Sequence, residues 1–101
     1  MSRLDQAGLT AAIVQVMEAA PDESGAADLV CPKGHIVVAA DPNDMKAAFK
    51  RVKKIDGYRW VAINREDLFA ANTLSLGSKA GIVDAGGKVL KAPDIPRKKM
   101  R

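Results

Sequence analysis

The segment His35–Ala40 limits the possible folds of this chain more than any other feature. Every residue after His35 in it is apolar, so a strand here must be covered on both faces and lie in the middle of a sheet. The β-prone run Asp28–Cys31 and the turn residues 32–34 precede it. They predict a hairpin in which the apolar segment is the second strand.

A helix with a clear beginning follows this strand. Asp41 suits the N-cap position and Pro42 the first helical position. Residues 56–57 end the helix, and 58–63 are expected to form a strand, which gives a β-helix-β passage. The apolar residues recur with helical spacing and form one stripe: Met45, Ala48, Phe49, Val52 and Ile55.

The rest of the chain adds a helix at the start and a hairpin at the end. Asp5 is the expected N-cap of a first helix that Pro21 ends at about Ala20, and residues 21–27 read as an acidic loop. Residues 68–71 suggest a short helical turn, residues 73–81 have no clear assignment, and 82–84 with 88–90 suggest a second hairpin. The first helix is expected to bury one face: Leu9, Ile13, Val16, Met17 and Ala20.

These elements predict one small α+β domain over residues 1–92, followed by a flexible basic tail over 93–101. The expected order is α-β-β-α-β-(α)-β-β, with two main helices on a four- to five-stranded, mainly antiparallel sheet. No segment is apolar enough to serve as a signal peptide or a membrane span, and the single Cys31 allows no internal disulfide. We therefore expect a cytoplasmic protein that does not bind membranes.

Positive charge is concentrated on the helix expected after Asp41. Residues 44–59 carry six basic residues against two acidic ones, although the whole chain has a net charge of only +4. Exposed bases in such an arrangement can contact phosphates. Tyr58 and Trp60 lie at the helix end, where an exposed ring could stack on a base, although we expect Trp60 to belong to the core. The candidate binding residues are Lys46, Lys50, Arg51, Lys53, Lys54 and Arg59, with Arg97, Lys98 and Lys99 in the tail.

Three interpretations of this basic face compete: a solvated surface without a ligand, a contact for nucleic acid, and a contact for an acidic protein surface. The sequence contains no standard nucleic-acid motif that would separate them. Our leading hypothesis is a non-catalytic binding module without cofactor or metal that acts through the basic helix. The alternative is a protein-protein regulator or inhibitor, such as an accessory or phage-type protein.

A remote alternative is an enzyme that uses Cys31 and His35. These residues flank the turn of the first hairpin and could face each other across it, with Asp28 orienting the imidazole. One Cys and one His leave a zinc site two ligands short. Residues 77–81 have some likeness to a phosphate-binding loop but lack its GxxxxGK[ST] order.

Overall fold

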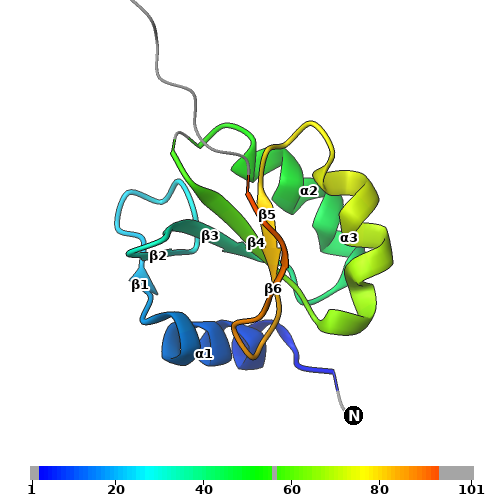
Figure 1. Ribbon diagram of the computed structural model, residues 1–101. Helices are drawn as coiled ribbons and strands as arrows, with labels where there is room; N and C mark the ends of the chain where they lie inside the picture. Colours follow the sequence, from blue (N-terminus) through cyan, green and yellow to red (C-terminus); the bar gives the residue numbers. More distant parts are fainter. Residues whose placement is uncertain (1–2, 56, 94–101) are drawn as a thin grey trace, which may run out of the picture.

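A computed structural model describes residues 3–55 and 57–93 and shows a mixed sheet with helices on both faces (Figure 1). In chain order the elements are α1 (Gln6–Met17), β1 (Ala20–Pro21), β2 (Leu29–Cys31), β3 (Gly34–Val38), α2 (Pro42–Val52), β4 (Arg59–Ala62), the 3-10 turn η1 (Arg65–Asp67), α3 (Leu68–Ser75), β5 (Gly81–Val83) and β6 (Val89–Lys91). The α+β class expected from the sequence is confirmed.

The six strands lie side by side in the order in which they occur in the chain. The three central strands β3, β4 and β5 are parallel, whereas β1, β2 and β6 join them through antiparallel pairs. His35 pairs with Arg59 and Trp60 with Gly81, so the parallel strands begin at one common edge. We call this edge the amino edge of the sheet and the opposite one the carboxyl edge.

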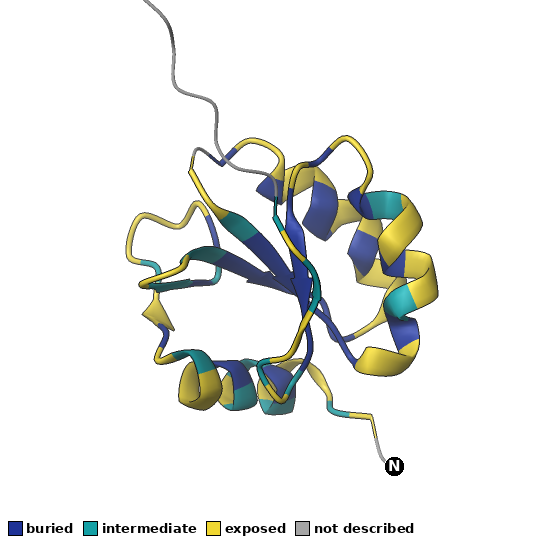
Figure 2. Ribbon diagram, viewed as in Figure 1, coloured by how far each residue is buried: buried dark blue, intermediate teal, exposed yellow. Residues whose placement is uncertain are grey.

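Each face of the sheet has its own hydrophobic core. On one face Ile36 and Val38 of β3 pack with α1, and on the other face Val37 packs with α2 and α3. This alternation follows from the two-residue period of a strand. Figure 2 shows that the central strands are buried along most of their length, with half-buried residues only where β3 and β4 begin. The prediction that the apolar segment forms a central strand is confirmed.

The predicted helix starts are also confirmed. The Asp5 side chain accepts a hydrogen bond from the Gly8 N–H at 2.8 Å, and the Asp41 side chain accepts one from the Asn43 N–H at 2.8 Å. The first helix ends earlier than predicted, at Met17, because Glu18 adopts a left-handed conformation with φ 54°. The chain has therefore already left the helix when it reaches Pro21.

The strand count differs from the prediction. Within the described residues the sheet has six strands; three of its five strand pairs are antiparallel, as expected for most of the sheet, and the two central pairs are parallel. The additional strand is β1, which pairs with β2 where the sequence suggests only a helix end and an acidic loop. Its residues Ala20 and Pro21 have low strand propensity, so the pairing depends on tertiary structure rather than on local preference.

The segment that had no clear assignment continues the third helix. Helix α3 extends to Ser75, beyond the short turn predicted over 68–71, and a turn then leads to β5 at Gly81. Within the described parts of the chain, no helix is long and apolar enough to cross a membrane. The predicted tail lies outside the described residues except for Pro93, which is half-buried.

Candidate functional site

The basic face predicted for the central helix is present on α2. Lys46, Lys50, Lys53 and Lys54 are exposed at or just beyond this helix, opposite the buried Met45, Phe49 and Val52. None of these four lysines forms an ion pair within residues 3–55 and 57–93. They thus leave positive charge available at the surface.

Arg51 is exposed on the same helix but already has partners. Its guanidinium lies 2.8 Å from Asp28 Oδ1 and also donates to the carbonyl oxygens of Gly25 and Ala26. These contacts tie the β1–β2 loop to α2, and the other Asp28 oxygen accepts from the Val38 N–H. We therefore assign Arg51 to the fold and no longer count it among the ligand-binding residues.

Arg59 lies at the amino edge, at the start of β4. It is half-buried, and its guanidinium donates to the Ile55 carbonyl oxygen, so it extends the basic surface only in part. Arg97, Lys98 and Lys99 lie outside the described residues. The described chain nevertheless ends at this edge, because Lys91 pairs with Ile82 and Pro93 packs beside Gly81.

An aromatic hollow of about 330 Å³ opens at the amino edge. Tyr58 is 44% exposed in its wall, whereas Trp60 is buried and its indole N–H donates to the Lys33 carbonyl oxygen at 2.9 Å. The two rings thus differ: Trp60 belongs to the core and Tyr58 is accessible. The lining residues are Pro32, Lys33, Tyr58, Trp60 and Pro93.

Tight packing fixes the shape of this hollow. A Cβ atom at Gly81 would lie 2.8 Å from both the Trp60 ring and Pro93, so only glycine fits between them. Gly34 has φ +125°, and a side chain there would overlap the Tyr58 backbone. Neither proline is close to Tyr58 in sequence, which is why the hollow could not be foreseen from local patterns.

The predicted Cys31–His35 pair is not formed. Cys31 pairs with Gly34 and packs on the α1 side of the sheet, whereas His35 pairs with Val30 and faces the opposite side. Asp28 does not orient the imidazole, since its carboxylate is bound to Arg51 and to the Val38 N–H. Only Pro32 and Lys33 separate the paired residues Cys31 and Gly34, so His35 is one position further along the strand and faces the other side.

The Asp22 carboxylate lies near His35, with 3.8 Å between Asp22 Oδ2 and His35 Nε2. Its hydrogen bonds from the Ser24 hydroxyl and the Ala27 N–H, together with the charge of His35, lower the pKa of Asp22 below its ordinary value. The bonds that Asp22 accepts close the β1–β2 loop on itself. We therefore assign Asp22 a structural role.

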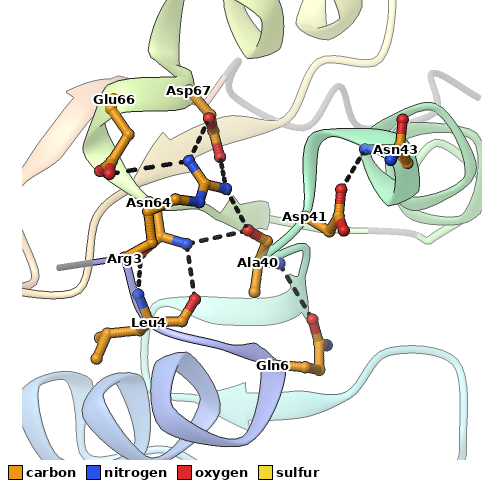
Figure 3. A network of polar contacts seen from close by, with 9 residues as sticks. All are labelled: Arg3, Leu4, Gln6, Ala40, Asp41, Asn43, Asn64, Glu66 and Asp67. Carbon is orange, nitrogen blue, oxygen red and sulfur yellow. Dashed lines mark hydrogen bonds and ion pairs between the residues drawn. The ribbon is translucent and has the colours of Figure 1, made fainter.

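A second polar cluster lies at the carboxyl edge (Figure 3). Asn64, buried two residues after the end of β4, accepts from the Leu4 N–H and donates to the carbonyl oxygens of Leu4 and Ala40. Arg3 forms a two-pronged pair with Asp67 at 2.7 and 2.8 Å, and this contact raises the pKa of the Arg3 guanidinium. The cluster fastens the N-terminal segment across the ends of the parallel strands.

An open hollow of about 770 Å³ borders this cluster, with Asp5, Asp41 and Asp44 in its wall. Asp5 and Asp41 are the helix caps, and the Gln6 amide bonds the Val38 carbonyl oxygen and the Ala40 N–H. The polar groups here hold the chain together. Sequence analysis missed the cluster, although the position of Asn64 directly after a predicted strand was a usable signal.

The glycine-bearing segment 77–81 is a closed turn rather than a phosphate cradle. The buried Ser78 hydroxyl donates to the Ser75 carbonyl oxygen and accepts from the Ala80 N–H. Lys79 is exposed on this turn, at the amino edge. The two edges therefore differ in charge: Lys33, Lys53, Lys54 and Lys79 lie at or near the amino edge, and the carboxyl edge is rich in aspartate.

Comparison with models of known protein families found no match, and searches of curated proteins and of solved structures found no significantly similar protein.

Proposed function

We propose that this protein is a non-catalytic binding module that holds nucleic acid against the basic face of α2 and the amino edge. The observation that carries the proposal is the set of exposed lysines on α2, which have no carboxylate partner within the described residues, although Arg3 and Arg51 are both paired. Free lysines release counterions when they meet phosphates, and this release drives non-specific binding to nucleic acid.

The arrangement of these lysines suits a linear polyanion. Lys46, Lys50 and Lys54 recur every fourth residue, which places them about 6 Å apart along one side of the helix or its extension. The row continues at its C-terminal end toward the amino edge, where Lys33 and Lys79 are exposed. An elongated chain of phosphates can follow such a row.

The hollow beside Tyr58 favours a single strand over a duplex. The exposed tyrosine ring offers a face on which an unpaired base can stack, and Lys33 on the rim is placed to meet a neighbouring phosphate. A volume of about 330 Å³ lies at the lower end of the range for small-ligand pockets, about 300–1,000 Å³, and so suits one base rather than a base pair.

A charge-swap experiment tests the proposal. We expect Lys50→Glu/Lys54→Glu to lose most of its affinity for fluorescent single-stranded DNA and RNA in an anisotropy titration. The matched control, Arg65→Glu/Lys88→Glu, changes the net charge equally with residues exposed near the carboxyl edge and should bind nearly as the unmodified protein does. An equal loss of affinity in both variants, or no loss of affinity in either, would contradict the proposal.

Tyr58→Ala tests the base-stacking part separately. Since stacking contributes about 1–3 kcal/mol per base, single-strand affinity should fall about tenfold while duplex affinity stays the same. If the unmodified protein binds neither DNA nor RNA but is retained by an acidic protein in a salt-sensitive way, the acidic-surface alternative replaces the present proposal.

A further inference from the structure

Helix α3 carries apolar side chains on two sides, which a helix covering a sheet does not require. Its inner side packs on the core through Ala71 and the half-buried Leu68 and Leu74. On its outer side Phe69 is 91% exposed, and Leu76, the residue that follows the helix, is 69% exposed.

A hollow of about 470 Å³ lies beside Phe69, between α3 and the last strand of the sheet. Leu68, Asn72 and Leu90 complete its lining, so its wall contains no charged residue. We call Leu68, Phe69 and Leu90 the α3 patch. The patch contains both a protruding ring and a hollow of suitable chemistry to receive one.

The sheet edge next to the patch is open. Strand β6 pairs only with β5 among the described residues, and it contains no proline. The opposite edge strand, β1, ends in Pro21, which lacks an N–H and protects that edge from pairing. Lys91 of β6 does not guard the open edge, because its ammonium bonds the Ser75 hydroxyl of α3 at 2.6 Å.

The charge distribution indicates what covers the patch. No charged residue occurs from Leu68 to Ser78, in a chain of which 28% of the residues are charged. A surface of this kind is electrostatically complementary to itself, since two copies can meet without burying a charge. Phe69 is in the first turn of α3, two residues after Asp67.

We propose that the α3 patch is a homodimer interface in which two copies of the chain meet about a two-fold axis. A two-fold interface needs one surface that complements itself, and the ring and hollow of this patch meet that need. The β6 strands then pair edge to edge in antiparallel orientation, and the Phe69 ring of each copy fills the hollow of the other. The α3 patch contains none of the lysines proposed to bind nucleic acid.

Sedimentation velocity of the nuclease-treated protein tests this proposal. The measured mass should rise with concentration from 10.7 kDa toward twice that value, and it should do so at high salt as well as low, because the contact is apolar. Phe69→Asp should weaken association at least about 100-fold, since the symmetry removes two buried rings and adds two buried charges.

Val14→Asp is the matched control, because it places the same charge at an exposed apolar residue of α1, on the opposite face of the sheet. This variant should dimerise as the unmodified protein does, and both variants should keep the circular dichroism spectrum of the folded chain. A monomer at every concentration up to about 1 mM would overturn the proposal and assign the patch to another protein or to residues at the chain ends. Equal association of the two variants would overturn it as well.

Discussion

Replacement of Asn64 should reveal how firmly the N-terminal segment is held across the carboxyl edge. Its side chain makes hydrogen bonds of 3.0, 2.9 and 3.0 Å, to the Leu4 N–H, the Leu4 carbonyl oxygen and the Ala40 carbonyl oxygen. Each of these hydrogen bonds contributes about 1 kcal/mol, so Asn64→Ala should lower the free energy of unfolding by about 3 kcal/mol. The loss should not be larger, because Ala40 keeps its bond from Arg3 at 2.8 Å and half-buried Leu4 can turn to water.

Urea unfolding followed by circular dichroism measures this loss, and Asn64→Asp provides an isosteric comparison. The carboxylate of that variant would face two carbonyl oxygens, so its pKa should be raised and its stability should fall as the pH rises through that value. If Asn64→Ala costs less than about 0.5 kcal/mol, or if Asn64→Asp is as stable as the unmodified protein at pH 7, the reasoning about this cluster is refuted.

Three further changes test other contacts. Arg51→Ala should lower the free energy of unfolding in urea by about 1 kcal/mol, because the β1–β2 loop loses its contacts with α2. Lys50→Ala, one position earlier, should change it by less than about 0.5 kcal/mol. Equal effects of the two variants would contradict the assignment of Arg51 to the fold. Gly34→Ala should cost about 2 kcal/mol or more in thermal unfolding, since a side chain there meets the Tyr58 backbone at positive φ, and an unchanged melting temperature would contradict this. The lowered pKa of Asp22 means that its carboxylate stabilises the fold above its ordinary pKa of 3.8 and that this contribution disappears as the pH falls. The stability difference between the unmodified protein and Asp22→Asn should therefore be largest near neutral pH and should disappear in acid. A stability difference that does not depend on pH would argue against this role of the Asp22 carboxylate.

The elements with clear local signals were predictable from the sequence. The apolar segment before Asp41 identified the central strand, and the two aspartate caps fixed the starts of α1 and α2. Strand β1 was missed because it is only two residues long and exists through its pairing with Leu29 and Val30. The parallel centre of the sheet also depends on tertiary structure, since the helix between β3 and β4 allows more than one return path.

The candidate site was predictable only in part. The helical period correctly predicted that the lysines on and just after α2 are exposed. It could not show that the Arg51 side chain reaches Asp28, 23 residues earlier in the chain. Of the two aromatic residues after the helix, Trp60 was correctly expected in the core, but no local pattern showed that the fold brings the Lys33 carbonyl oxygen to its indole N–H. The exposed position of Phe69 was hidden for the same reason: its outward direction depends on which side of α3 meets the sheet.

The salt dependence of single-strand binding tests the central claim most directly. We assume that the four exposed lysines on and just after α2, Lys46, Lys50, Lys53 and Lys54, each neutralise one phosphate. The logarithm of the association constant should then fall with the logarithm of salt concentration with a slope of about −2.8, which is an affinity loss of about 50-fold between 50 and 200 mM. Lys50→Gln/Lys54→Gln should reduce the slope to about −1.4, because two contacts are removed. An unchanged slope in this variant, or an affinity that does not respond to salt, would contradict a nucleic-acid contact through the basic face of α2.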